Sequence, residues 1–430
     1  MTGNAGNQSK KTAYARVLFC IIGIGYLFPF SALTQPVDYW DTLFPDFDIE
    51  FPITAIYMWT NLIILAMFVF LGGTSPNYNL RMYVGFLGQF IALIIVPTSY
   101  FWHLSKERNL YVVLGSTAFA AGVTALIDSC VISLATKYPI SCQESLQVGI
   151  GLSTLIGSVY RIFTKAAFPV TMVVQSSLLY FYTGAATILV CIFAYYLLLL
   201  IPPIKCSSHI ENEIVENSVT VTTKADYDEE GISLLPTTLS EKENEEYQSI
   251  SPRTSFENEP PSSRKEVFSK IIFNEFIVFM VFSSTLALWP PLVAEIKSIQ
   301  FPNLNETEWW PLLLLFDFSI LDVIGRFCVS YRGPLTANNI WIPVLIRVVV
   351  LSPIIILLAK GIFFTHDIWS VLFVGLLGFT NGYLGSLSII FVNECVPEKD
   401  KGLAGTLTGF TLNAGLVAGA TLAIFVQKLV

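Results

Sequence analysis

The most constraining feature of this sequence is a series of eleven apolar segments, each about 20 residues or longer, that polar loops separate. A helix needs about 20 apolar residues to cross the hydrocarbon core of a bilayer. Because that core offers no water to backbone groups, each segment is expected to be helical. We therefore predict an all-α polytopic membrane protein. The expected spans are Ala13–Thr34, Pro52–Leu71, Met82–Trp102, Leu110–Thr136, Leu146–Pro169, Leu178–Ile201, Phe268–Val293, Trp310–Ser330, Ile340–Ala359, Ile368–Asn393 and Leu403–Gln427.

The composition supports a membrane protein and excludes several other classes. Hydrophobic residues make up 53% of the 430 residues and charged residues only 13%, whereas a soluble domain carries about 25% charged residues. The net charge of −8 gives no reason to expect a nucleic-acid partner. The seven cysteines lack metal-type spacing, and no phosphate-binding loop or nucleophile elbow is present. We therefore expect neither an enzyme nor a bound cofactor or metal.

One long polar segment divides the chain. Residues 202–267 are rich in Ser, Thr, Glu and Asn and show no clear amphipathic period, so we predict a disordered linker. A six-helix bundle at residues 13–201 precedes the linker, and a five-helix bundle at residues 268–430 follows it. Residues 1–12 form a short polar N-terminal segment.

The distribution of Lys and Arg among the loops predicts the orientation. These residues favour cytosolic loops, and they are more numerous on the side of the N-terminus and the linker. We therefore predict a cytosolic N-terminus and linker, and an odd number of spans then places the C-terminus on the extracellular or luminal side. The sequon at Asn305 falls in a loop predicted to lie outside, so we expect glycosylation there.

The linker also carries an acidic dileucine pattern that ends in Leu234 and Leu235. Endosomal and vacuolar sorting adaptors read such patterns, although they also arise by chance in acidic loops. The plasma membrane is the first expectation for this protein, and an endolysosomal or vacuolar membrane is the alternative.

Ionisable residues inside the eighth span are the strongest functional signal. Asp322 and Arg326 are four residues apart and share one helix face, and Ser319 lies one turn earlier on that face. A charged group alone in a bilayer costs a few kcal/mol or more, so the two must pair, face a water-filled cavity or bind a ligand. Our interpretation is that they line a substrate path. The alternative is a structural ion pair that locks two helices together.

Other polar or aromatic residues within the spans allow two interpretations. Asp128 lies in the fourth span and is either a hydrogen-bonded structural carboxyl or a functional group, namely a proton carrier or a counter-charge for a cationic substrate. Arg347, Asn413 and Gln147 are interpreted as links between helices. Trp289 is a candidate stacking platform for a flat ring, although most membrane aromatics serve packing.

Several motifs, in order along the chain, resemble those of the equilibrative nucleoside transporter family. The resemblance covers the membrane part from Gly23 onward and excludes the linker. The motifs are Gly23–Pro29 (GIGYLFP), Arg161–Ala166 (RIFTKA), Trp289–Pro290 with Glu295–Ser298, Phe318–Arg326 (FSILDVIGR), Thr380–Leu384 (TNGYL) and Ala404–Gly405.

This resemblance implies a major-facilitator-like arrangement of six plus five helices around a central cavity, and transport by alternating access. It also implies that Asp322 and Arg326 contact the nucleoside, where charged groups form strong hydrogen bonds to neutral polar ligands. Leu27, Phe30 and Trp289 stand at positions that resemble the apolar and aromatic cavity wall of the family. Leu416 also resembles a position in that wall.

The chain departs from the family pattern at three positions around the expected cavity. Phe30-Ser31 stands where the family often has Trp-Asn, Asp128 where it commonly has Gln, and Ser319 where it has Asn. An acid in place of an amide introduces a titratable group, which suits proton coupling or a positively charged substrate. We hypothesise that Asp128 makes transport depend on pH.

The predicted function is therefore a nucleoside transporter, either facilitative or proton-coupled, whose partners are its nucleoside substrate, protons and the lipid bilayer. Its predicted substrate-binding residues are Asp322, Arg326, Ser319, Leu27, Phe30, Trp289, Asp128 and Leu416. A nucleobase or organic-cation carrier of the same fold is the alternative. A membrane receptor or scaffold that does not transport represents a different class.

Overall fold

Helices account for the regular structure of the chain. The computed structural model describes residues 2–47, 49–71, 77–201, 263–306 and 308–427, and no strand occurs in these ranges. The predicted linker therefore lies outside the described residues from 202 to 262. The described residues on both sides of it form one compact unit.

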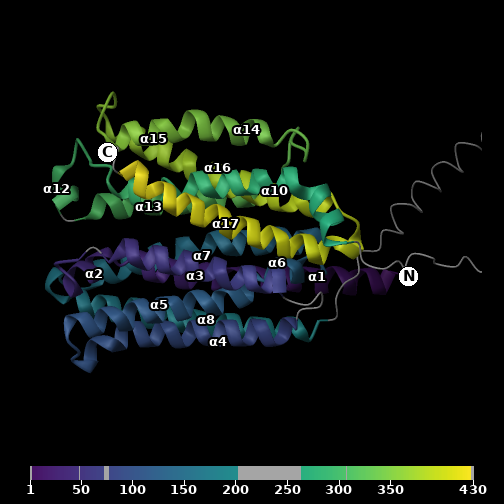
Figure 1. Ribbon diagram of the computed structural model, residues 1–430, viewed down its shortest axis with the longest axis horizontal. Helices are drawn as coiled ribbons and strands as arrows, with labels where there is room; N and C mark the ends of the chain where they lie inside the picture. The colour runs from purple at the N-terminus through teal and green to yellow at the C-terminus, as the bar shows by residue number, and fades with distance from the viewer. Residues whose placement is uncertain (1, 48, 72–76, 202–262, 307, 428–430) are drawn as a thin grey trace, which may run out of the picture. The chain divides into compact units, whose positions relative to one another are not determined.

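In the described residues, the first half of the chain contains six long helices and several short ones (Figure 1). They are α1 (Thr2–Thr34), α2 (Val37–Leu43), α3 (Glu50–Leu71), α4 (Tyr78–Thr98), η1 (Ser99–Trp102), α5 (Lys106–Asp128), α6 (Val131–Ala135), α7 (Ile140–Ala167), η2 (Val170–Met172) and α8 (Val173–Leu199).

The second half repeats this pattern of long helices joined by short ones. They are α10 (Arg264–Leu286), α11 (Pro291–Ala294), α12 (Pro302–Glu306), α13 (Trp309–Phe327), η3 (Cys328–Ser330), α14 (Trp341–Ile346), the π-helical turn η4 (Arg347–Leu351), α15 (Ser352–Ala359), α16 (Asp367–Glu394), η5 (Glu398–Asp400) and α17 (Lys401–Gln427).

The all-α prediction is confirmed, and each predicted span corresponds to a helix or to a broken pair of helices. Within the described residues, nine helices are long and apolar enough to cross a membrane. Helix α3 has a shorter apolar stretch, at Pro52–Phe68. Helix α13 is continuous, but its apolar sequence is interrupted by the charged residues Asp317, Asp322 and Arg326. The total of eleven spans stays a prediction.

Several helices begin before the predicted spans, among them the first helix of each bundle. Helix α1 begins at Thr2 rather than Ala13, because the polar residues before the apolar run continue the helix. Helix α10 begins at Arg264, inside the segment predicted as linker, and its first turn carries Glu266, which suits the positive end of the helix dipole.

Breaks in two spans help to build the interior. The fourth span stops at Asp128 and resumes as α6, and the hydroxyl of Ser129 donates to the carbonyl of Leu126 at 2.7 Å. Such a local bond competes with helix continuation. Pro290 and Pro291 follow α10, where a missing N–H prevents the helix from continuing unbroken. The two breaks place Asp128 and Trp289 beside the central cavity described below.

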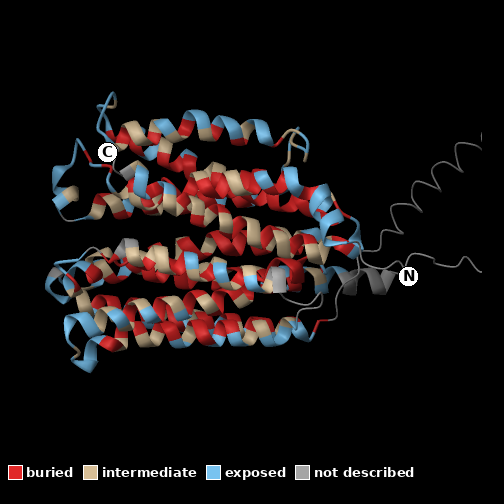
Figure 2. Cartoon of the chain, in the orientation of Figure 1, coloured by how far each residue is buried: buried red, intermediate tan, exposed pale blue. Residues whose placement is uncertain are grey.

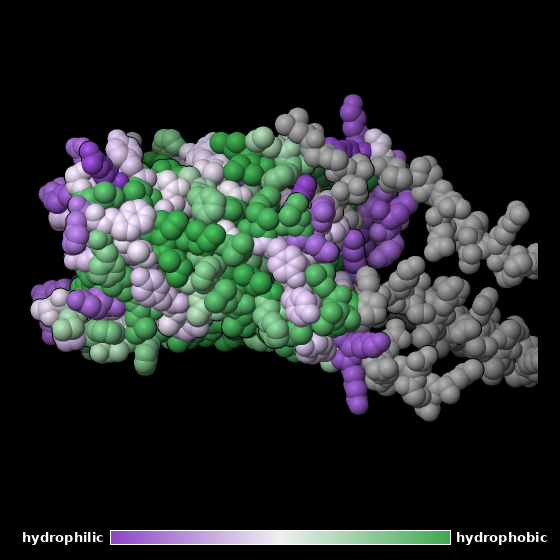
Figure 3. All heavy atoms as spheres, turned by 90° about the horizontal axis from the view of Figure 1, so that it is seen from below, coloured by the Kyte–Doolittle hydropathy of each residue, from purple (hydrophilic) through white to green (hydrophobic). Residues whose placement is uncertain are grey.

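The outer surface has the polarity expected of a membrane protein. Buried residues lie along the faces between helices (Figure 2), whereas large apolar side chains such as Trp59, Ile63 and Val349 are exposed. Figure 3 shows hydrophobic residues across the middle of one face and hydrophilic residues gathered at its ends. A band of this kind matches the hydrocarbon core of a bilayer.

Close contacts between helices fix the geometry of both halves. Helix α1 packs against α7, where Gly149 lies so close to the carbonyl of Cys20 that a Cβ atom would collide with it. Helix α13 packs against α16 in the same manner, with Gly382 against the carbonyl of Asp322. Small residues permit such approaches in membrane helices. The halves meet mainly where α7 contacts α13 and where α3 and α6 contact α17.

Candidate functional site

A cavity lies between the two halves. Residues of α1, α3, α5, α6 and α7 form one wall, and residues of α10, α13, α16 and α17, with Trp289, form the other. It is lined by Tyr26, Leu27, Phe30, Tyr57, Met58, Asn61, Thr124, Asp128, Ile132, Gln147, Ile150, Thr154, Phe282, Thr285, Leu286, Trp289, Asp322, Arg326, Asn381, Leu412, Asn413 and Leu416.

The structure brings seven of the eight predicted substrate-binding residues to this one cavity. They are Asp322, Arg326, Leu27, Phe30, Trp289, Asp128 and Leu416. Ser319 is the exception, because it is fully buried and its hydroxyl donates to the carbonyl of Leu315 at 2.8 Å. It does not line the cavity. That the other seven contact substrate stays a prediction.

Asp322 and Arg326 form a buried ion pair on the cavity wall. The Arg326 Nε to Asp322 Oδ2 distance is 2.8 Å, and the two side chains are only 5% and 3% exposed. Asn381 of α16 donates to the other Asp322 oxygen at 2.7 Å. Arg326 Nη1 crosses to the other half and donates to the backbone and side-chain oxygens of Gln147 at 3.1 and 3.2 Å. Both charges are therefore satisfied, and one of them joins the halves.

A chain of hydrogen bonds links this pair to other helices of the second half. Thr285 donates to Asn381 Oδ1 at 2.7 Å, and Arg347 Nη2 donates to Thr285 at 2.7 Å. Arg347 also donates to Ser284 at 2.5 Å and to Thr380 at 3.0 Å. Arg347 thus links η4 to α10 and α16, as its interpretation as an interhelical link requires.

Asp128 sits on the opposite wall in a different setting. Its side chain is 2% exposed, and Asn61 of α3 donates to its Oδ2 atom at 2.6 Å. Tyr26 and Asn413 are its other polar neighbours. No ion pair to Asp128 occurs within the described parts of the chain. Its Oδ1 atom has no hydrogen-bond partner of good geometry there.

Aromatic side chains form the remaining walls. The ring of Trp289 stacks on Phe318 with centroids 4.6 Å apart and an angle of 15° between the planes. Its Nε1 is buried and donates to none of the described residues. Phe30 packs on Tyr57 with ring centroids 5.1 Å apart, and the Tyr57 hydroxyl lies 2.9 Å from that of Thr124. The cavity therefore offers flat apolar surfaces with a few polar atoms, as small-molecule sites commonly do.

Sequence reasoning missed several lining residues. Asn61 carries a recognisable signal, because it is the only strongly polar side chain within the apolar run Pro52–Leu71. Tyr26, Tyr57 and Thr124 carry none, because such residues also occur in ordinary membrane packing. Gln147 and Asn413, interpreted as helix links, also line the cavity.

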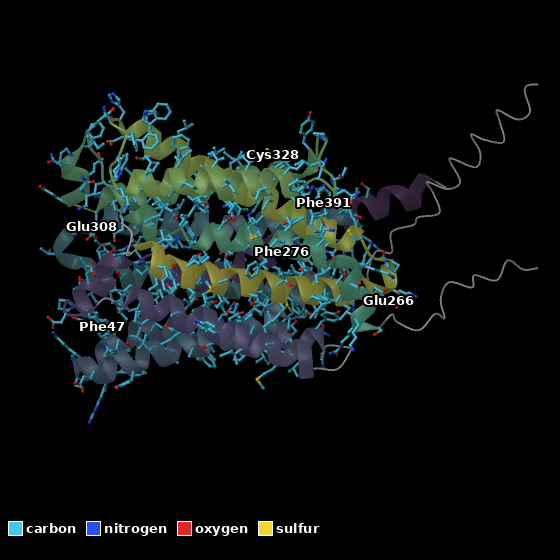
Figure 4. The ribbon with its side chains drawn as sticks, turned by 45° about the horizontal axis from the view of Figure 1, so that its top comes forward. Phe47, Glu266, Phe276, Glu308, Cys328 and Phe391 are labelled. Atoms are coloured by element: carbon cyan, nitrogen blue, oxygen red, sulfur yellow. The ribbon has the colours of Figure 1, made fainter. Side chains whose placement is uncertain are left out.

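A second charged cluster lies at one end of the bundle. Arg161 is almost fully buried and pairs with Asp38, and Lys165 lies 3.8 Å from the same carboxylate. The Lys165 ammonium also stands 5.6 Å from the ring centroid of Trp309, across the boundary between the halves. Burial raises the pKa of neighbouring Glu308, an effect that Lys165 opposes. Figure 4 shows Glu308 at this end, with Phe47, far from Glu266.

Comparison with solved structures defines the fold. The chain resembles the major facilitator superfamily proton:xylose symporter XylE bound to 6-bromo-6-deoxy-D-glucose, with a TM-score of 0.63 and 11% identity over 98% of this chain and 90% of that one. The major facilitator transporter FucP in the outward conformation gives a TM-score of 0.57 with 11% identity over 96% of this chain and 91% of that one. The fold is thus that of a major facilitator transporter, as predicted.

Sequence comparison defines the family. A family model described as "Nucleoside transporter" matches residues 114–428. The chain therefore belongs to the nucleoside transporter family. It is 25% identical to the Arabidopsis thaliana "Equilibrative nucleotide transporter 1" over 99% of this chain and 88% of that protein. It is also 25% identical to the Homo sapiens "Equilibrative nucleoside transporter 1" over 71% of this chain and 66% of that protein.

These findings confirm the resemblance drawn from the motifs and the prediction of an integral membrane transporter. Family and fold both point to a transporter rather than an enzyme.

Proposed function

We propose that this protein carries nucleosides across a membrane by alternating access between its two halves. The observation that carries this proposal is the cavity at their interface, whose wall holds the Asp322–Arg326 pair. The names of its relatives in Arabidopsis thaliana and Homo sapiens, a nucleotide and a nucleoside transporter, support the proposal. Residues 13–201 and 268–430 are the two bodies that rock about the cavity.

The ion pair supplies donors to the substrate while its own charge stays compensated. Arg326 uses Nε for Asp322 and Nη1 for Gln147, whereas Nη2 donates to none of the described residues. A substrate hydroxyl or a ring nitrogen can accept from Nη2, and hydrogen bonds from charged donors are the stronger kind. The bond from Nη1 to Gln147 must break when the halves separate there, so it favours the arrangement of the halves in this structure.

The test is uptake of radiolabelled adenosine and uridine into proteoliposomes, with and without an inward proton gradient. Saturable uptake without a gradient is expected for a facilitative carrier. Uptake that requires the gradient identifies a proton symporter of the same substrates. Folded protein that carries neither compound under either condition contradicts nucleoside transport.

Asp128 is the proposed proton site. It is a buried carboxyl group on the cavity wall without a cationic partner among the described residues, so a proton or a positively charged ligand can compensate its charge. We expect the pH profile of uptake to change in the Asp128→Asn variant. Identical profiles for wild type and variant would remove Asp128 from any proton pathway.

The absence of a cationic partner for Asp128 among the described residues also favours an organic cation as a second candidate substrate. A cation held by Asp128 needs no proton, and the aromatic wall at Phe30 and Trp289 also suits a cation. Competition of adenosine uptake by a small aromatic amine distinguishes the two candidates. A nucleoside carrier retains most of its adenosine uptake under this competition, whereas a cation carrier transports the amine and little adenosine.

The proposed location is the plasma membrane, with an endolysosomal or vacuolar membrane as the alternative. The N-terminus and linker are proposed to be cytosolic and the C-terminus extracellular or luminal, in agreement with the opposite ends at which Figure 1 marks N and C. The dileucine residues Leu234 and Leu235, proposed to bind sorting adaptors, lie outside the described residues. Terminal tags probed before and after permeabilisation test this orientation.

Asn305 is the proposed glycosylation site, at the end of the bundle that this orientation places outside. Its side-chain amide exchanges hydrogen bonds of 2.8 and 2.9 Å with the backbone of Ser298, so a glycan requires this contact to open. A mobility shift on glycosidase treatment, absent in Asn305→Gln, tests the assignment.

A further inference from the structure

The wall of the cavity that belongs to the first half has two acceptor atoms that receive no hydrogen bond of good geometry from the described residues. Asn61 and Asp128 are each 2% exposed and line the cavity. The Asn61 amide nitrogen donates to Asp128 Oδ2 at 2.6 Å, which fixes the two side chains together. Asn61 Oδ1 and Asp128 Oδ1 remain without a partner of good geometry among the described residues. Buried acceptors of this kind are uncommon, and each requires an explanation.

Two of the neighbouring protein donors form other hydrogen bonds, although Asn413 and Tyr26 also stand beside the Asp128 carboxyl. The side-chain amide of Asn413 donates to the carbonyl of Gly409 at 2.9 Å. The hydroxyl of Thr124 donates to the carbonyl of Ala120 at 2.8 Å. Tyr26 stands beside the Asp128 carboxyl but leaves Oδ1 without a well-formed bond. Asn61 Oδ1 and Asp128 Oδ1 belong to residues that line the cavity, so a ligand that enters it can complete the hydrogen bonding of both atoms.

The opposite wall has the reverse polarity. Trp289 Nε1 is a buried donor without a partner in the described chain, and Arg326 Nη2 is a second donor that no described residue uses. The polar atoms of the cavity residues that lack partners in the described chain are thus acceptors on one side and donors on the other. A ligand that fits must present donor hydrogens toward Asn61 and Asp128 and acceptor atoms toward Trp289 and Arg326.

We infer that Asn61 and Asp128 form a base-selecting pair that accepts the two N–H bonds of an exocyclic amino group. This inference rests on the proposed nucleoside transport and names the substrates preferred within it. Adenine and cytosine carry such an amino group, whereas guanine and thymine, and likewise hypoxanthine and uracil, carry a carbonyl oxygen at the corresponding edge. That oxygen would meet two acceptors, one of them charged, and would leave both without donors.

The predicted consequence is a preference for adenosine over inosine and for cytidine over uridine. Sites that hydrogen-bond a substrate group reject the analogue that lacks it, because their own polar atoms are then left unpaired. Hydrogen bonds to a charged acceptor suggest a preference of roughly 10- to 100-fold in each comparison. Within each pair, the two nucleosides differ only in one ring substituent and in the protonation of the adjacent ring nitrogen. Their ring size and their ribose are the same.

The experiment measures competition of radiolabelled adenosine uptake by unlabelled adenosine, inosine, cytidine and uridine in proteoliposomes. Wild type is expected to show both preferences. The Asp128→Asn variant replaces one acceptor with an amide that can donate, so the preferences are expected to disappear or to reverse toward inosine and uridine. A reversal cannot arise from poor folding, which would lower uptake of all four nucleosides together.

Glu275→Gln is the matched control. Glu275 is another buried acid of a membrane helix, 2% exposed, and accepts from Thr408 at 2.8 Å, but it does not line the cavity. The same change from acid to amide is therefore expected to leave both preferences in place. Asn61→Leu removes the second acceptor and is expected to weaken both preferences in protein whose thermal unfolding confirms that it is folded.

The outcomes separate the inference from the function on which it rests. Absence of all nucleoside uptake overturns the proposed function. If nucleosides are taken up but the apparent affinities for the amino-bearing and carbonyl-bearing nucleosides agree within about twofold, the inference alone is overturned. Preferences that persist in Asp128→Asn assign base selection to other residues. A last outcome is that uptake does not distinguish the bases but depends on the ribose hydroxyls, and that only Asp128→Asn removes this dependence. The pair would then bind the sugar, which also overturns the inference.

Discussion

The two carboxyl groups on opposite walls of the cavity are both buried, yet they differ in what compensates them. Asp322 is held by Arg326 and Asn381, and its environment is complete without a ligand. Asp128 accepts a well-formed hydrogen bond from Asn61, and Tyr26 and Asn413 also stand beside its carboxyl, but its Oδ1 atom has no partner of good geometry in the described chain. A paired buried charge supports the structure and positions a donor, whereas an unpaired one creates a demand for a proton or a ligand. We therefore propose that the first wall anchors the substrate and that the second selects it.

The largest effect is expected when the paired carboxyl loses its partner. Arg326→Met leaves Asp322 as an uncompensated buried charge, and breaking a buried pair in this manner costs about 3–5 kcal/mol. We expect a strongly lowered unfolding temperature and no measurable adenosine uptake. Thermal unfolding of the purified protein, beside a proteoliposome uptake assay, measures both consequences.

Lys270→Met provides the control for that substitution. Lys270 pairs with Glu266 at 3.0 Å, but both side chains are about half exposed, and exposed pairs contribute little to stability. Its unfolding temperature should remain close to that of wild type. If Arg326→Met were as stable as Lys270→Met, the buried pair would not be the structural anchor described here.

A smaller effect on stability, with a clear effect on function, is expected at the unpaired carboxyl. Asp128→Asn removes no ion pair and keeps the side-chain volume, so the free energy of unfolding should change by less than about 1 kcal/mol. Uptake should persist with altered selectivity and an altered pH profile. Destabilisation as large as that of Arg326→Met would place a hidden partner at Asp128 and remove the contrast between the walls.

Variants of Trp289 separate two contributions of the wall that holds Asp322 and Arg326, namely a hydrogen-bond donor and a stacking surface. Trp289→Phe keeps an aromatic ring against Phe318 but removes Nε1, the buried donor without a described partner. A neutral hydrogen bond contributes about 0.5–1.5 kcal/mol, so the apparent affinity for adenosine should fall by about 2- to 10-fold. Trp289→Ala also removes the stacking surface and should reduce affinity further. Equal effects of the two variants would mean that the donor alone matters.

The smallest effect is expected at the end of the bundle. Lys165→Met removes the contact with the Trp309 ring, and a cation–π contact at a partly exposed site contributes about 0.5–1 kcal/mol. The maximal uptake rate should change by less than about fivefold, because the contact favours only one of the alternating arrangements. A complete loss of uptake would show that the charged cluster around Lys165 has a role beyond the contact between the two halves at this end of the bundle.

The sequence was sufficient for the parts of the site that lie on one helix. The four-residue spacing of Asp322 and Arg326 predicts their pairing, because helical geometry alone brings them together. It also predicts most of the helices, since hydrophobic length is read directly from the chain. The bounds of α1 and α10 were less predictable, because polar residues can extend a helix beyond the membrane.

Contacts between distant segments were not predictable from the residues alone. Asn61 and Asp128 are 67 positions apart, and their bond depends on how α3 packs against α5. The stack of Trp289 on Phe318 likewise depends on the break after α10. Ser319 shares the predicted face of α13 but is covered by packing, which a helical face alone does not reveal.

The most direct test of the central claim is saturable uptake of radiolabelled adenosine by three proteins reconstituted at equal amounts. These are wild type, the neutral double variant Asp322→Asn with Arg326→Gln, and Asp128→Asn. We predict saturable uptake by wild type and by Asp128→Asn, and none by the double variant although it folds. Adenosine uptake by the double variant equal to that of wild type would contradict the assignment of this ion pair as the substrate anchor.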